Sequence, residues 1–194
     1  AAHPDVDKVA FTGETATGTR ILRAAAETIK KVSLELGGKS PNIIFADADL
    51  EKAAAAAVPA AFGNSGQTCT ARTRVFVGKT SYDQFMNHLV DQAGNFTVGN
   101  PLEATTRMGP LISAQQLDRV SNYLDVGQRE GAEIVYGGQR PAGLDQGNFL
   151  EPTIFAQVGN DMRIAREEIF GPVVSVIPFA DEADVVKQAN ANDY

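Results

Sequence analysis

Strand-like and helical segments alternate along the 194 residues, and this alternation limits the fold more than any other feature of the sequence. Residues 32–36 have the period-two pattern of a strand, and residues 173–177 are mostly apolar, as in a buried strand. The predicted strands are residues 9–11, 32–36, 43–45, 75–77, 134–136, 173–177 and part of 148–155. The predicted helices are residues 15–31, 50–62, 81–90, 113–124, 161–168 and 184–191. Strands separated by helices predict an α/β fold, with a parallel or mixed sheet and helices on its faces.

Polar residues mark the expected beginnings of three helices. Asp49 precedes an alanine-rich segment and is a suitable N-cap. Ser81 is followed three residues later by Gln84, and Ser113 by Gln116, so both pairs predict a capping box.

Composition excludes several classes of partner and site. The formal net charge of −7 argues against a nucleic acid, because phosphate backbones are bound by an excess of Lys and Arg. No apolar run approaches the roughly 20 residues of a membrane span, so we expect no membrane partner. A single cysteine allows no internal disulfide and fits a reducing compartment, so we expect a cytoplasmic protein. His3 and His88 are too isolated for a histidine-based metal site, and we predict none.

Cys69, the only cysteine, is the first candidate catalytic residue. A lone cysteine is commonly a small buried apolar residue. Here Gly63, Gly66 and the polar residues between them predict a tight loop that brings the thiol to a surface or cleft. Backbone N–H groups of such a loop could stabilise an oxyanion that forms beside the sulfur.

Two segments before Cys69 have features of a ligand site. Glu35 lies at the end of a predicted strand and is followed by two glycines, which allow a close approach to the backbone. Sheets of this class place ligands at such strand ends, although a solvated strand face is equally consistent with Glu35. Gly13 precedes a predicted helix, whose N-terminus favours an anion, and a plain strand-to-helix turn is the alternative.

The last unusual segment contains Glu167 and Glu168, which are followed by Ile-Phe-Gly-Pro. We expect this acidic pair to end the helix of residues 161–168, where acids are unfavourable. A chance surface pair is the alternative interpretation of this segment alone.

Together these segments resemble the signature motifs of the NAD(P)-dependent aldehyde dehydrogenase superfamily, in the order of that family. The matching segments are Phe11-Thr-Gly13, Leu34-Glu-Leu-Gly-Gly-Lys-Ser-Pro41, Gly66-Gln-Thr-Cys69 and Glu167-Glu-Ile-Phe-Gly-Pro172. The resemblance covers essentially the whole chain. It implies a three-layer fold with a mostly parallel sheet flanked by helices, as in the family's catalytic domain.

The resemblance also implies oxidation of an aldehyde to a carboxylic acid with NAD or NADP. Cys69 would be the nucleophile, forming a thiohemiacetal and then a thioester, and Glu35 would activate the hydrolytic water. The residues implied in cofactor binding are Gly13, Leu36, Glu168 and Phe170. Two residues depart from the family pattern: Arg72 replaces a small residue, and Glu14 replaces a common serine, so we expect the Glu14 side chain to point away from the diphosphate.

In the family, most of the cofactor domain lies before the segment that matches Phe11. We therefore expect residues 1–36 to be the C-terminal remnant of a cofactor-binding domain and residues 37–194 to be a catalytic domain that is incomplete at its C-terminus. We expect this chain alone to be an inactive fragment and the full-length protein to be a homo-oligomer.

Two other function classes remain open from the residues alone. In a cysteine hydrolase or acyltransferase, Cys69 would pair with His3 or His88. In a non-catalytic module, the fold would be retained without chemistry, although the presence of both Cys69 and Glu35 argues against this.

Overall fold

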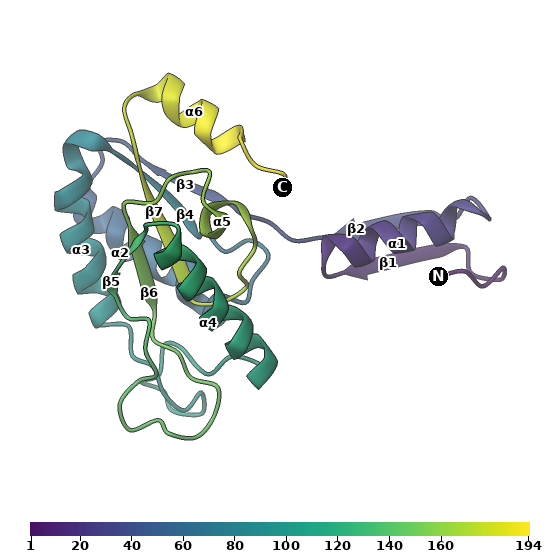
Figure 1. Cartoon of the computed structure of the whole chain (residues 1–194). Coiled ribbons are helices and arrows are strands. Elements are labelled where there is room, and N and C mark those ends of the chain that lie inside the picture. The colour runs from purple at the N-terminus through teal and green to yellow at the C-terminus, as the bar shows by residue number, and fades with distance from the viewer. The chain divides into compact units, whose positions relative to one another are not determined.

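The computed structural model describes residues 1–194, which form two compact units. Residues 1–38 with Tyr194 form one unit, and residues 39–193 form the other. Figure 1 shows the elements of both units in the order of the chain. The assignment of the two units to a cofactor-binding and a catalytic domain stays a prediction.

The smaller unit is a strand–helix–strand unit. Strand β1 (Lys8–Thr12) pairs in parallel with β2 (Lys31–Glu35), and helix α1 (Thr15–Ala26) connects them. Alternate residues of both strands are half-buried, and for β2 this is the burial that the period-two pattern of residues 32–36 predicts. Helix α1 approaches β2 closely at Gly18, where a Cβ atom would lie 2.7 Å from Cδ2 of Leu36.

The larger unit contains a five-stranded mixed sheet in the order β3-β4-β7-β6-β5. Its strands are β3 (Pro41–Ile44), β4 (Arg74–Gly78), β5 (Glu133–Tyr136), β6 (Thr153–Ala156) and β7 (Val173–Phe179). All neighbouring pairs are parallel except β5 with β6. Strands β4 and β6, on either side of the central strand β7, are buried along their whole length, which is typical of a sheet covered on both faces.

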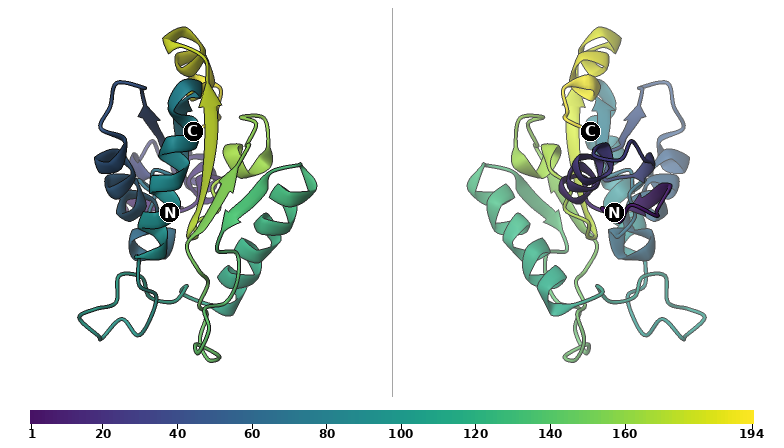
Figure 2. Two further views of the ribbon diagram at one scale, coloured as in Figure 1. Left: turned by 90° about the vertical axis from the view of Figure 1, so that its left-hand side faces the viewer. Right: turned by 90° about the vertical axis from the view of Figure 1, so that its right-hand side faces the viewer.

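Helices cover both faces of this sheet (Figure 2). The elements are α2 (Leu50–Phe62), α3 (Tyr82–Gly94), α4 (Ala114–Arg129), α5 (Arg163–Arg166) and α6 (Glu182–Asn190), with 3-10 turns η1 (Gly63–Gly66) and η2 (Lys79–Ser81). Helices α2 and α3 pack on one face, and α4, α5 and α6 contribute to the cluster on the other. The three-layer, mostly parallel fold predicted from the sequence is confirmed.

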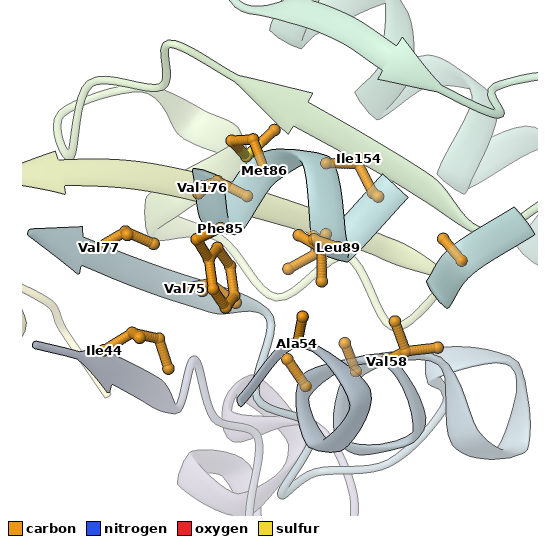
Figure 3. Close-up of a cluster of buried hydrophobic side chains, with 14 of the residues drawn as sticks. Ile44, Ala54, Val58, Val75, Val77, Phe85, Met86, Leu89, Ile154 and Val176 are labelled. Atoms are coloured by element: carbon orange, nitrogen blue, oxygen red, sulfur yellow. The ribbon is translucent and has the colours of Figure 1, made fainter. Parts of the chain in front are cut away.

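Each face of the sheet has its own apolar core. Val75 and Val77 of β4 point to the α2–α3 side, where Figure 3 shows them beside Phe85 and Leu89 of α3. Phe76, between the two valines, belongs to the core on the α4 side. This alternation follows from the strand geometry, because successive side chains point to opposite faces of a sheet.

The expected N-caps are right at Asp49 and Ser113, but neither of the two predicted capping boxes forms. The Asp49 side chain accepts a hydrogen bond from the Lys52 N–H at 3.1 Å, and Ser113 accepts one from the Gln116 N–H at the same distance. The capping box at Ser81 is wrong: its hydroxyl donates to the Gly78 carbonyl instead, at 3.1 Å. The reason is the 3-10 turn η2, which occupies the residues immediately before α3.

Two predicted helices were too long. The helix expected over residues 15–31 ends at Ala26, and Ile29 has a left-handed backbone with φ of 53° and is 92% exposed. The helix expected over residues 161–168 is the single turn α5, because Glu167 already has an extended backbone. None of the helices is both long and apolar enough to cross a membrane.

Candidate active site

Cys69 lies at an exposed turn in the larger unit, after helix α2 and the turn η1. The Ala71 N–H donates to the Thr68 carbonyl at 3.0 Å, and the Arg72 N–H donates to the Ala60 carbonyl of α2 at 3.1 Å. These bonds fix the turn on both sides of the thiol. Cys69 therefore lies at the surface of the chain, as the glycine-containing loop predicts.

The backbone reverses just before this turn through three left-handed residues in succession. Asn64, Ser65 and Gly66 have φ of 53°, 56° and 68°. The Asn64 side chain donates to the Gln67 carbonyl at 3.0 Å, and the Ser65 hydroxyl donates to the Gly109 carbonyl at 2.8 Å. These hydrogen bonds hold a conformation that non-glycine residues rarely adopt.

Gly66 brings the cysteine loop against the segment that follows Glu167 and Glu168. A Cβ atom at Gly66 would lie 2.0 Å from the carbonyl oxygen of Gly171 and 2.8 Å from the nitrogen of Pro172. Only a glycine permits this backbone contact. Two segments that the sequence presents about a hundred residues apart are therefore neighbours in the fold.

The turn leaves backbone donors beside the thiol. The N–H groups of Cys69 and Thr70 make no hydrogen bond within the chain. Such groups can stabilise negative charge on an oxygen that develops next to the sulfur. The geometry of the loop is therefore suited to attack of a thiolate on a carbonyl carbon.

In the smaller unit, the structure brings Gly13 and Glu35 together. The Gly13 N–H donates to the Glu35 carbonyl at 3.0 Å, at the ends of β1 and β2. The Glu35 side chain is exposed, and Leu36 is half-buried against α1. The unit thus presents a carboxylate at the end of a parallel strand and beside the start of a helix.

Glu167 and Glu168 come after α5 and not inside it, which corrects their expected place at a helix C-terminus. Glu168 is half-buried, and Phe170 is 38% exposed. Phe170 has a left-handed φ of 58°, so the chain turns sharply before Gly171 and Pro172. The pair is thus part of an extended segment, where the unfavourable helix-end interaction does not arise.

Two buried basic residues near this segment, Arg74 and Lys39, have no role in the predictions from the motifs. Arg74 is 2% exposed and donates to the carbonyls of Lys39 and Ala189, each at 3.0 Å. Lys39 is 3% exposed, and burial lowers its pKa to about 7, an effect that Arg74 reinforces and Glu168 and Glu167 oppose. Arg74 directly precedes the strand-like run 75–77, and Lys39 lies four residues before the run 43–45; this placement was the available signal.

His88 and His3 are the alternative partners that the residues alone left open for Cys69. His88 is half-buried in α3 and makes no hydrogen bond with Cys69. His3, in the smaller unit, accepts a hydrogen bond from the Asp5 N–H at 3.2 Å. Arg72 is exposed, so its departure from the family pattern affects the solvent side of the loop.

Solved structures match the whole of this chain. Aldehyde dehydrogenase from Bacillus cereus, solved as an NAD+ complex, is 50% identical and superposes with a TM-score of 0.95, covering 100% of this chain and 39% of that one. Betaine aldehyde dehydrogenase from Staphylococcus aureus, also solved with NAD+, is 42% identical and superposes with a TM-score of 0.97. This match covers 100% of this chain and 39% of that one.

Sequence comparisons agree with the structural ones. A provisionally named aldehyde dehydrogenase of Staphylococcus saprophyticus is 50% identical over 193 residues, which are 99% of this chain and 41% of the relative. The chain thus spans about two fifths of the length of the curated relatives it matches. The model of the aldehyde dehydrogenase family matches residues 1–194. The chain therefore belongs to the aldehyde dehydrogenase family.

Proposed function

We propose that the protein containing this chain oxidises an aldehyde to a carboxylic acid with NAD+ or NADP+, with Cys69 as the nucleophile. The observation that supports this most is the cysteine loop. It exposes the only thiol of the chain beside two unbonded N–H groups and rests against Gly171 through Gly66. Family membership adds the reaction class.

The proposed reaction begins when the Cys69 thiolate attacks the carbonyl carbon. A C–S bond forms, and the carbonyl oxygen becomes an oxyanion that the Cys69 N–H stabilises. The bound dinucleotide supplies the acceptor for the hydride that leaves this carbon, and Cys69 then holds a thioester. The Glu35 carboxylate takes a proton from water as the water attacks the thioester, the C–S bond breaks, and the acid departs from the restored thiolate.

The residues present fit a nicotinamide dinucleotide. Helix α1 has no acidic residue in its first turn, and Glu14 before it makes no capping hydrogen bond through its side chain, so the helix N-terminus is compatible with a diphosphate. We propose that Gly13 lets the dinucleotide approach this end and that Leu36 contacts the nicotinamide region. Glu168 would accept hydrogen bonds from ribose hydroxyls, and Phe170 would pack beside the ribose. The NAD+ complexes of the two related enzymes support this choice of cofactor.

We also propose that residues 1–194 alone do not turn over, since they cover only 41% of the curated relatives. The full-length protein is proposed to be a cytoplasmic homo-oligomer that acts on a small-molecule aldehyde. Size-exclusion chromatography with light scattering tests the oligomer directly.

The activity is tested with the full-length protein and a panel of aldehydes, by following NADH or NADPH absorbance. Cys69→Ala is expected to abolish cofactor reduction, and Arg72→Ala, which changes an exposed side chain three residues away, serves as the control. Aldehyde-dependent reduction that survives Cys69→Ala would reject the proposed chemistry. Turnover by residues 1–194 alone, lost in Cys69→Ala, would reject the proposal that this chain is inactive.

A further inference from the structure

One face of helix α4 holds the chain at residues 167–170, which we call the 167–170 segment. The α4 residues that contact it are Gln116, Arg119 and Tyr123. Their spacing of three and four residues places them on one side of the helix. Side chains of α4 thus contact every residue of the 167–170 segment. This segment includes Glu168 and Phe170, the two residues proposed to contact the ribose.

Glu167 anchors the first residue of the segment through its carboxylate. The Tyr123 hydroxyl donates to Glu167 Oε2 at 2.7 Å. Arg163 donates from Nε to Oε1 at 2.8 Å and from Nη2 to Oε2 at 3.0 Å, which is a bidentate pair. The hydrogen bond and charge of Arg163 lower the pKa of Glu167, so this carboxylate is ionised at neutral pH. Bidentate arginine–carboxylate pairs fix geometry as well as charge.

The rest of the segment is held by its main chain. Arg119 Nη2 donates to the Glu168 carbonyl at 2.9 Å, and Gln116 Nε2 donates to the Phe170 carbonyl at 2.7 Å and to the Ile169 carbonyl at 3.2 Å. These three hydrogen bonds end on main-chain carbonyl groups, so they hold the backbone of the segment. The carboxylate of Glu167 is bound by α4 through the Tyr123 hydroxyl.

The backbone held in this way includes a left-handed residue. Phe170 has φ of 58°, a conformation that side-chain-bearing residues retain only when their surroundings over-determine it. Ile169 before it is 3% exposed, so the segment is also fixed by burial at one residue. Loss of a bond to α4 is therefore expected to release the turn that orients Glu168 and Phe170.

From these contacts we infer that Glu167, bound by Arg163 and Tyr123, is a positioning residue that presents Glu168 and Phe170 to the nicotinamide ribose. This inference rests on the proposed function. It assigns the Glu167 carboxylate to holding the segment, and it keeps for Glu168 the ribose contact of the proposed function. Tyr123 and Arg163 act through Glu167 and belong to the same positioning group.

The test compares Glu167→Ala and Tyr123→Phe with wild type in the full-length protein. Lys52→Ala is the control, because it breaks another surface ion pair, with Asp49, on α2. We expect hydrogen exchange in the peptide covering residues 167–173 to quicken about fivefold in both variants. The dissociation constant of NAD+ should rise by a similar factor, whereas that of AMP, which lacks the nicotinamide ribose, should not change.

Each outcome tests either this inference or the proposed function on which the inference rests. If hydrogen exchange in the peptide covering residues 167–173 is unchanged in both variants, the inference is overturned. It is also overturned if hydrogen exchange is faster but the affinity for NAD+ is unchanged. An equal loss of NAD+ and AMP affinity indicates a general structural effect and also overturns it. If the wild-type protein binds no NAD+, the proposed function fails instead, and the exchange rates still show whether Glu167 holds the segment. Tyr123→Phe keeps the test decisive if Glu167→Ala does not fold.

Discussion

Replacing Gly66 by alanine tests whether the cysteine loop depends on its backbone contact with Gly171. The new Cβ atom would lie 2.0 Å from the Gly171 carbonyl oxygen and 2.3 Å from its carbonyl carbon. Both atoms are backbone, and Gly171 in turn contacts Val120, because a Cβ atom at Gly171 would lie 2.4 Å from Cγ2 of that residue. Neither side can move freely, so the loop or the 167–170 segment must shift.

Two effects add at this position. Gly66 has φ of 68°, and alanine in that left-handed conformation costs about 1 kcal/mol. Overpacking against a fixed backbone costs about 1 to 3 kcal/mol more. The free energy of unfolding should fall by about 2 to 4 kcal/mol, which lowers the melting temperature by roughly 5 to 15 °C for a unit of this size.

The neighbouring Gly63 offers a matched control in the same loop. Its φ of −52° suits alanine, and no atom lies within 4 Å of its hypothetical Cβ. Thermal unfolding followed by circular dichroism should show a large loss for Gly66→Ala and almost none for Gly63→Ala. Equal melting temperatures for Gly66→Ala and wild type would refute the contact between the two segments.

Three further changes test the charged and capping groups. Arg74→Lys should lower the free energy of unfolding by about 2 to 4 kcal/mol in urea denaturation, because lysine cannot supply the planar donors that Arg74 directs at buried carbonyls; an unchanged value contradicts this role. The pKa of Lys39, lowered from 10.5 to about 7, means that the folded state binds fewer protons than the unfolded state between these values. The stability of wild type relative to Lys39→Met should therefore rise from about pH 7 to about pH 10, and a flat difference would show that Lys39 stays charged. Ser113→Ala should cost about 1 kcal/mol by removing the N-cap of α4, whereas Ser113→Asp should restore it, and equal melting temperatures for the two would exclude capping.

Local patterns predicted the elements whose cause is local. The period-two burial of β2 and the N-caps at Asp49 and Ser113 depend on residues within a few positions of one another. The helix expected to reach residue 31 failed because apolar spacing alone does not report a chain reversal, and Ile29 lies exposed in the turn.

The motifs proposed residues for the candidate site but gave no information on their arrangement. The motifs name Cys69 and Glu168, whose roles stay predictions, and nothing near either residue indicates that Gly66 contacts Gly171. The Gln116 side chain illustrates the reason: a capping box predicts a bond to the start of its own helix, but the amide donates to Phe170, 54 residues away. Long-range hydrogen bonds of this kind depend on tertiary packing, which sequence spacing does not encode.

The central claim is that Cys69 forms a thioester that Glu35 helps to hydrolyse, and mass spectrometry of the trapped enzyme tests it most directly. The full-length Glu35→Gln variant is mixed with an aldehyde and NAD+ and quenched in acid. A single acyl group on the peptide containing Cys69, together with a burst of NADH of about one equivalent, is the predicted result. An unmodified Cys69 peptide during steady turnover, or an acyl group on another residue, would contradict the account.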